Sequence, residues 1–211
     1  MPLPRLKQAD ANEWNKLLQR RSDAVDMRHH TDQRIMISEI AFQLGRIIGQ
    51  GTFGRVYEAL NISNGTMLAV KVINIGKAGE AFMHQLECEI KLLESLRHQN
   101  IVNMLGCMMR GTELNILMEY VDGKSIDDVL QSMGALHETI IRKYIKQLLL
   151  ALEYCHTRNI LHRDIKGKNI LVNSKGIIKL ADFGSAKIVQ DISEKDNPSA
   201  GFSYTPLYVV L

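Results

Sequence analysis

The 211-residue chain has little cysteine, and none of it forms a pattern that would build a disulfide framework or a zinc site. Cys88, Cys107 and Cys155 are widely spaced and odd in number, so we expect reduced thiols and a cytoplasmic location. The first residues lack an apolar core, which argues against a secretory signal. No apolar run approaches the length of a membrane span, and neither repeats nor low-complexity tracts occur.

Neither sign of charge is in large excess. The net charge is +3, with 23% charged and 45% hydrophobic residues. This balance is typical of an ordinary soluble globular protein and gives no reason to expect nucleic acid or a membrane as a partner. The length is enough for one or two small domains with a buried core.

Hydrophobic patterning separates a polar extension from a strand-rich part. Residues 1–41 are polar and charged, and two interpretations stay open: a docking or regulatory helix, or a partly disordered surface leader, which the weak pattern favours. Residues 42–121 then alternate short strand-type runs with one helical stretch. The expected strands are residues 42–49, 55–60, 66–73, 101–107 and 114–120, and the expected helix is residues 78–96.

Residues 122–211 begin with a mainly helical pattern. A short helix is expected over residues 125–133, with Ser125 as its N-cap. A longer helix is expected over residues 137–158, because apolar residues recur there at helical spacing. The apolar positions of this second helix are Ile141, Ile145, Leu148, Leu149, Leu152 and Cys155.

The most informative motif follows that helix. Asp164 lies in the tripeptide HRD, Asn169 follows five residues later, and Asp182 opens the tripeptide DFG a further thirteen residues on. The first Asp can accept a proton from a hydroxyl nucleophile, while the Asn and the second Asp can hold Mg²⁺ against phosphate oxygens. A single Asp here would more often be a turn or cap residue. The joint spacing makes that interpretation weak.

A glycine loop lies near the start of the strand-rich part. Residues 49–56 read GQGTFGRV, in which backbone N–H groups can approach phosphate oxygens because side chains are absent. A simple hairpin is the alternative interpretation of the loop alone. In dinucleotide-binding folds a similar pattern opens a helix, whereas here it lies between two expected strands.

Lys71 is placed among apolar residues at the end of the third expected strand. A lysine in such a position is costly unless it is paired. Glu89 on the following helix is the natural partner, and Glu87 is a competing choice on a different face. The pair would orient the ammonium group toward the α- and β-phosphates of a nucleotide.

Together these motifs resemble the eukaryotic protein kinases. Residues 162–172 (HRDIKGKNILV) and 179–187 (KLADFGSAK) are similar to the sterile-20/sterile-11 serine/threonine kinases, in particular the MAP kinase kinase kinases. The resemblance covers residues 42 to about 208. It implies an α+β, bilobal protein-kinase fold, with a complete N-lobe over residues 42–121 that holds a five-stranded sheet and one helix. Residues 122–211 would form an incomplete helical C-lobe.

The resemblance also implies a function. It is ATP- and Mg²⁺-dependent phosphoryl transfer to Ser or Thr of a protein substrate, with a downstream kinase in a MAP kinase cascade as the expected partner. Asp164 and Lys166 would be catalytic, and Asn169 and Asp182 would bind the metal. His162 would be a packing residue, and Arg163 would pair with a phosphorylated loop.

For the nucleotide, the resemblance implies that a glycine loop and a lysine–glutamate pair contact the phosphates. It also implies that a gatekeeper residue precedes the hinge, that the hinge backbone binds adenine, and that apolar side chains cover the faces of the ring. Met118 would be the gatekeeper and residues 119–121 the hinge. The implied residues are Ile48, Gly49, Gly51, Gly54, Val56, Ala69, Lys71, Glu89, Met118, Glu119, Val121 and Leu171.

Residues 183–208 resemble an activation segment, with Ser199, Ser203 and Thr205 as candidate phosphorylation sites. The Ala-Pro-Glu motif of the family does not appear before Leu211, so we expect an incomplete domain with exposed apolar side chains on the helix at 137–158. An inactive kinase-fold protein that binds ATP or a partner therefore stays open as an alternative. A dinucleotide-binding oxidoreductase is disfavoured, because Lys166, Asn169 and Asp182 would have no role in it.

Overall fold

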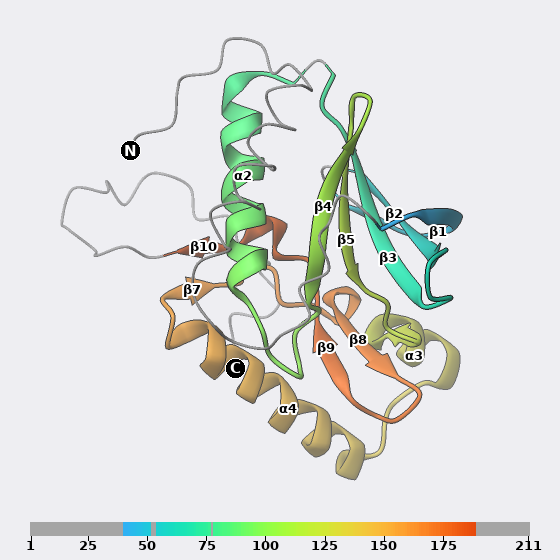
Figure 1. Ribbon diagram of the computed structural model, residues 1–211. Coiled ribbons are helices and arrows are strands. Elements are labelled where there is room, and N and C mark those ends of the chain that lie inside the picture. The colour runs from blue at the N-terminus through green and yellow to red at the C-terminus, as the bar shows by residue number, and fades with distance from the viewer. Residues whose placement is uncertain (1–39, 52–53, 77, 189–211) are drawn as a thin grey trace, which may run out of the picture. The chain divides into compact units, whose positions relative to one another are not determined.

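The computed structural model describes residues 40–51, 54–76 and 78–188 (Figure 1). They divide into two compact units. The first holds the described residues up to Ile90 together with Met104–Tyr120, and the second holds Lys91–Asn103 and the described residues from Val121 onward. Residues 1–39 and 189–211 lie outside the described residues, so the expectations for the extension and for Ser199, Ser203 and Thr205 stay predictions. The lobe boundaries of the sequence analysis also stay predictions.

The first unit is built on an antiparallel sheet of five strands in the order β1-β2-β3-β5-β4. The strands are β1 (Phe42–Gly51), β2 (Gly54–Asn61), β3 (Met67–Asn74), β4 (Met104–Arg110) and β5 (Glu113–Glu119). The predicted five-stranded sheet is confirmed. The strand expected from residue 101 was placed too early, because Ile101 forms a bridge with Leu180 and the ladder of β4 starts at Met104.

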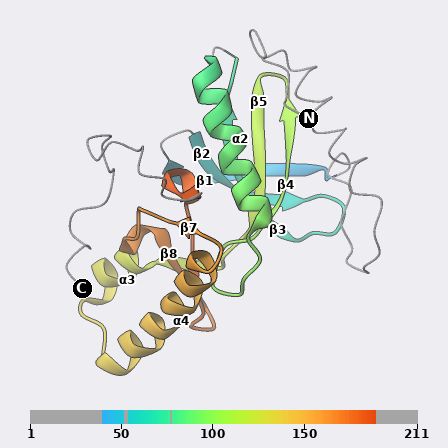
Figure 2. The same cartoon turned by 90° about the vertical axis from the view of Figure 1, so that its left-hand side faces the viewer.

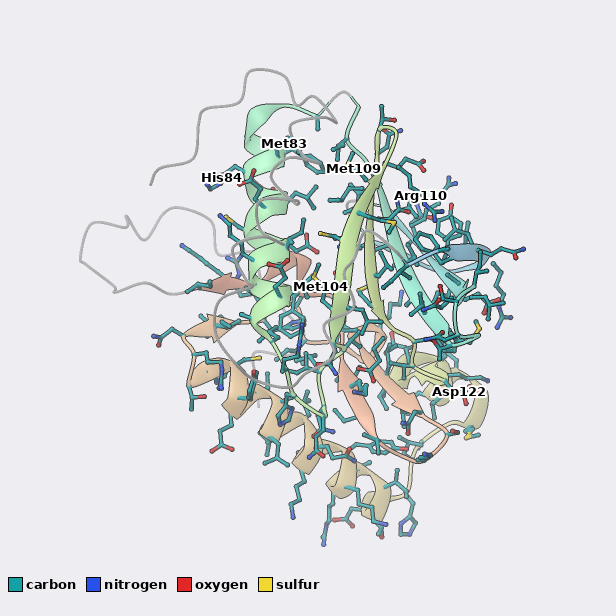
Figure 3. All side chains as sticks on the ribbon, viewed as in Figure 1. Met83, His84, Met104, Met109, Arg110 and Asp122 are labelled. Carbon is teal, nitrogen blue, oxygen red and sulfur yellow. The ribbon has the colours of Figure 1, made fainter. Side chains whose placement is uncertain are left out.

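Alternation along β3 gives the sheet two different faces. Leu68 and Val70 belong to a buried apolar cluster on one face, and the Arg110 guanidinium lies 3.8 Å from the Phe42 ring beside it (Figure 3). Ala69 and Lys71 alternate with Leu68 and Val70 along β3, so they lie on the opposite face of the sheet. The cluster consists of Ile40, Phe42, Ala59, Leu68, Val70 and Leu117.

The helix α2 (Glu80–Ser95) runs along the sheet beside β4 and β5, as the two views show (Figures 1 and 2). Its apolar residues Leu86 and Ile90 are 2% and 0% exposed, while Phe82 is only half-buried. The helical periodicity therefore identified the side of α2 that is buried.

The second unit combines helices with short strands. Its helices are α3 (Ile126–Met133) and α4 (Glu138–His156), with 3₁₀ turns η2 (Gly167–Asn169) and η3 (Phe183–Ser185). A three-stranded sheet is ordered β6-β8-β9, and β7 pairs with β10. These strands are β6 (Gly123–Ser125), β7 (Ile160–Leu161), β8 (Ile170–Asn173), β9 (Ile178–Leu180) and β10 (Lys187–Ile188).

The start of α3 follows the prediction. Ser125 is the N-cap, and its Oγ accepts a hydrogen bond from the Asp128 N–H at 3.1 Å. The Asp128 carboxylate in turn accepts from the Ser125 N–H at 3.3 Å, which completes a capping box.

The apolar stripe of α4 is covered only in part. Cys155 is fully buried, whereas Ile145 and Leu149 are 47% and 59% exposed. The predicted exposure of apolar side chains on this helix is confirmed. No helix among the described residues is long and apolar enough to cross a membrane.

Candidate active site

The loop between β7 and β8 brings three of the predicted residues together. Lys166 Nζ donates to Asp164 Oδ2 at 2.6 Å, and Asn169 Nδ2 donates to the same oxygen at 2.9 Å. Asn169 Nδ2 also donates to the Asp164 backbone carbonyl at 2.8 Å. The Asp164 carboxylate is thus held by a cation and an amide at the same time.

Asn169 lies next to Ala181, the residue before Asp182, although the two are twelve positions apart in the sequence. The β8–β9 register pairs Ile170 with Leu180, and the Ala181 N–H donates to the Asn169 carbonyl at 2.8 Å. Antiparallel pairing therefore brings the start of β8 and the end of β9 to the same place.

Asn169 and Asp182 fit a magnesium ion by their donor chemistry. The Nδ2 of Asn169 is already used by Asp164, so Oδ1 is the amide atom left for a ligand. Amide and carboxylate oxygens are ligands that Mg²⁺ accepts, usually with substrate phosphate oxygens completing the shell. No group of three or more His, Cys, Asp or Glu side chains among the described residues could hold a metal. By their donor types, the Asn169 amide oxygen and the Asp182 carboxylate fit Mg²⁺ bound together with a phosphate.

His162 is a packing residue, as predicted. It is 1% exposed, and its ring centroid lies 4.6 Å from that of Phe183 in an edge-to-face arrangement. The Asp164 N–H donates to Nδ1 at 3.3 Å, so Nε2 carries the proton toward the Ala181 carbonyl at 3.0 Å. Burial is the largest cause of the lowered pKa of His162, and the positive charge of Lys166 lowers this pKa further. The neighbouring Ala181 carbonyl, Asp182 and Asp164 act in the opposite direction and raise it, but by less.

Two residues of the site have left-handed backbone conformations. Arg163 has φ of 63°, and Asp182 has φ of 59° and ψ of 75°. Such values are uncommon for residues other than glycine and concentrate at functional sites. The Arg163 Nε also donates to the Ser185 carbonyl at 2.6 Å. Nothing in the sequence pattern indicated these two conformations.

In the first unit, the predicted Lys71–Glu89 pair is present. Lys71 Nζ lies 2.7 Å from Glu89 Oε1, and the two side chains are 8% and 4% exposed. The competing choice, Glu87, is not the residue in this ion pair. The other carboxylate oxygen of Glu89 is buried and has no hydrogen-bond partner among the described residues.

Strand register places four predicted nucleotide-binding residues on one face of the sheet. Val56 on β2 is opposite Lys71 on β3, and Ala69 on β3 is opposite Met118 on β5. Directly opposed residues share a face, and so do residues two apart on a strand. This is the face on which Lys71 meets Glu89 of α2.

The glycine loop is described except for Thr52 and Phe53. A Cβ on Gly54 would collide with the Val72 carbonyl, so the fold itself requires this glycine. A Cβ on Gly51 would meet nothing closer than 3.8 Å. The absence of a side chain at Gly51 is therefore not explained by packing.

The remaining predicted residues divide by unit. Glu119, on β5 of the first unit, is half-buried, and Ile48 is 44% exposed. Val121 and Leu171 belong to the second unit and are half-buried. Leu171 pairs with Ser125 of β6 and with Lys179 of β9.

Gln147 and Asn100 belong to none of the predicted motifs. Gln147 is a polar residue among the apolar positions of α4, and Asn100 is 1% exposed in the loop before β4. The two side chains are joined by a hydrogen bond of 2.9 Å from Asn100 Nδ2 to Gln147 Oε1. The interrupted apolar run was the one signal that could have drawn attention to Gln147.

The buried Lys71–Glu89 pair of the first unit and the Asp164–Lys166–Asn169 loop of the second unit are each features of the phosphotransferase class of protein. Residues 42–209 match the family model described as protein kinase domain, and the chain belongs to this family. It is 46% identical over 164 residues to mitogen-activated protein kinase kinase kinase ANP1 of Arabidopsis thaliana, covering 75% of this chain and 25% of that protein.

The same kind of relative occurs outside plants. The chain is 40% identical over 175 residues to mitogen-activated protein kinase kinase kinase 3 of Homo sapiens, covering 81% of this chain and 28% of that protein. The predicted resemblance to MAP kinase kinase kinases is confirmed. The chain spans about a quarter of the length of these curated relatives.

Proposed function

We propose that this chain catalyses the transfer of the γ-phosphoryl group of ATP to a Ser or Thr hydroxyl of a protein substrate. The observation that carries the proposal is the arrangement of Asp164, Lys166 and Asn169 around one carboxylate oxygen. The names of the relatives direct the proposal to a substrate that is itself a protein kinase, in a MAP kinase cascade.

In this proposal Asp164 and Lys166 have complementary charges in the transfer step. Asp164 orients the substrate hydroxyl and takes its proton as the oxygen–phosphorus bond forms. Lys166, held 2.6 Å from Asp164, places a positive charge where the phosphoryl oxygens develop negative charge. The bond between the γ-phosphorus and the bridging oxygen of ADP breaks, and the proton leaves from Asp164.

Asn169 and Asp182 are proposed to hold Mg²⁺, which would neutralise charge on the phosphates when bound. Lys71, oriented by Glu89, is proposed to contact the α- and β-phosphates. Gly49, Gly51 and Gly54 are proposed to let backbone N–H groups approach the phosphates.

The remaining proposed contacts are to the nucleoside. Adenine is assigned to the backbone between Glu119 and Val121. Ile48, Val56, Ala69, Met118 and Leu171 are assigned to the apolar surroundings of the ring.

The test is transfer of radiolabelled phosphate from Mg·ATP to a generic protein substrate. We expect transfer by the unmodified chain and its loss in Asp164→Asn, which removes the proton acceptor but keeps the shape of the side chain. Lys71→Met should also abolish transfer, with circular dichroism verifying that the variant is folded. Thermal stabilisation by ATP without any transfer would contradict the proposal and favour nucleotide binding alone.

A further inference from the structure

The side chain of Gln147 joins α4 to two other segments of the second unit. Its Oε1 accepts from Asn100 Nδ2 at 2.9 Å and from the Ile178 N–H at 3.1 Å. Its Nε2 donates to the Gly176 carbonyl at 3.2 Å and to the Lys143 carbonyl at 3.4 Å. Three of these four partners lie outside α4, and two of them lie on the β8–β9 hairpin.

That hairpin carries the two residues proposed to bind metal, one at each strand end. Asn169 directly precedes β8, and Asp182 follows the end of β9 by two residues. The pairing of Ile170 with Leu180 and the hydrogen bond from Ala181 to Asn169 fix the two ends against each other. A tilt of the hairpin would therefore move both metal-binding residues.

The turn end of the hairpin is held from two directions. Gln147 binds the Gly176 carbonyl and the Ile178 N–H from α4. The Ser174 N–H donates to the carbonyl of Asp122 at 3.0 Å. Asp122 lies close to α3 (Figure 3). Gln147 supplies the side-chain contact from α4.

Asn100 extends the same network to β9. Its Nδ2 also donates to the Ile178 carbonyl at 2.9 Å, and its own carbonyl accepts from the Leu180 N–H at 2.8 Å. Loss of the Gln147 amide would leave the buried Asn100 donor and the Ile178 N–H without this acceptor. A network of this kind loses order when one member is left unsatisfied.

We propose that Gln147 is a positioning residue for Asn169 and Asp182, and that it acts through the β8–β9 hairpin. The proposal rests on the function proposed above, because that function assigns the metal to these two residues. Metal sites demand placement within about 0.5 Å. Loss of a group that hydrogen-bonds directly to a ligating side chain typically weakens metal binding by about 10- to 100-fold, so we expect a contact at the far end of the hairpin to act at the lower end of that range.

Two substitutions separate the contacts of Gln147. Gln147→Leu removes all four hydrogen bonds, whereas Gln147→Glu keeps an acceptor for Ile178 and loses the donor to Gly176. Ala151→Gly is the matched control, because Ala151 is fully buried on the same helix and its loss weakens α4 without removing a hydrogen bond to the hairpin.

The experiment measures Mn²⁺ binding by electron paramagnetic resonance, with the full chain and a non-hydrolysable ATP analogue. Hydrogen exchange at the Ile178 amide is followed in the same variants. We expect Gln147→Leu to weaken Mn²⁺ binding about tenfold and Gln147→Glu about threefold, with faster exchange at Ile178 in the Leu variant. Ala151→Gly should change Mn²⁺ binding less than about twofold.

Unchanged Mn²⁺ binding in Gln147→Leu overturns the proposal, and so does an equal weakening in Ala151→Gly, which would indicate general loss of stability. If the unmodified chain binds no Mn²⁺ with the analogue, the function proposed above fails, and the positioning role fails with it. The two failures are distinguishable, because unchanged Mn²⁺ binding in Gln147→Leu overturns the positioning role alone, whereas absence of Mn²⁺ binding in the unmodified chain overturns the proposed function as well.

Discussion

At the scale of single residues, the glycines of the loop between β1 and β2 differ in what requires them. Gly54 faces the Val72 carbonyl so closely that no side chain fits. Gly51 has room for a methyl group, since the nearest atoms are the Gly54 carbonyl oxygen at 3.8 Å and Lys71 Cε at 3.9 Å. The first is a requirement of the fold, and the second is consistent with a requirement of a ligand.

We therefore expect Gly54→Ala and Gly51→Ala to affect different properties. Gly54→Ala should lower the free energy of unfolding by about 1–3 kcal/mol, because the added Cβ forces the backbone of β2 away from β3. Gly51→Ala should leave it within about 0.5 kcal/mol and weaken binding of an ATP analogue instead. Urea unfolding and a binding titration measure the two effects, and an equal loss of stability in both variants would contradict the distinction.

The Lys71–Glu89 pair is the most buried ion pair among the described residues, with side chains 8% and 4% exposed. Removing one partner of a buried pair leaves an uncompensated charge, which commonly costs about 3–5 kcal/mol. Lys71→Met should therefore be strongly destabilised in urea unfolding. The double variant Lys71→Met with Glu89→Met should recover most of the loss.

The matched control for this pair is Arg46→Met, which breaks the ion pair between Arg46 and Glu58. Arg46 is 76% exposed, so its loss should lower the free energy of unfolding far less than Lys71→Met does. A double variant as unstable as Lys71→Met would show that burial of charge is not the reason for the instability.

At the scale of elements, the capping box at the start of α3 makes a quantitative test possible. Ser125→Ala removes the acceptor for the Asp128 N–H and should lower the free energy of unfolding by about 1 kcal/mol. Ser132→Ala in the same helix is the control, because its exposed hydroxyl only donates to the Val129 carbonyl at 3.2 Å. Chemical denaturation measures both variants, and an equal effect would contradict a capping role.

At the scale of the whole molecule, two histidines tie stability to pH. Burial lowers the pKa of His162, and burial together with Lys179 and Arg158 lowers the pKa of His98. Each folded-state pKa lies below the ordinary value of 6.5, so the unfolded chain binds more protons as the pH falls below that value. Their contribution to stability is complete above pH 6.5 and is lost progressively below it.

As the pH is lowered from 6.5 toward the folded-state pKa values, we expect the free energy of unfolding to decrease. The decrease should be less steep in His162→Gln. Glutamine retains a donor and an acceptor but does not titrate. His84→Gln is the control, because His84 is exposed on α2. Urea unfolding over a pH series measures the slopes, and parallel curves for the unmodified chain and His162→Gln would contradict this origin of the pH dependence.

The elements of the fold were largely predictable from local patterns. The five strands, α2 and the capped start of α3 follow from periodicity and from one capping residue, which act over a few neighbours. The start of β4 was not predictable, because Ile101 is drawn into a bridge with Leu180, almost eighty residues away. A pairing partner at that distance leaves no trace in a local pattern.

The candidate site divides in the same way. The residue types and spacing of Asp164, Asn169 and Asp182 were visible in the sequence, because phosphate and magnesium chemistry limits which side chains can serve. The left-handed backbone of Asp182 and the four hydrogen bonds of Gln147 were not visible. The hydrogen bonds of Gln147 depend on contacts between α4, the loop before β4 and the β8–β9 hairpin.

The family of this protein and the residues proposed for its chemistry were already visible in the sequence, since motif spacing and residue type are local properties of the chain. The choice of Glu89 rather than Glu87 as the partner of Lys71, and the binding of Gln147 to the hairpin between Asn169 and Asp182, became visible in the folded molecule. A hydrogen bond or ion pair requires atoms within about 3 Å of each other. That distance is set by the packing of segments that are far apart in the sequence, and a local sequence pattern does not encode it.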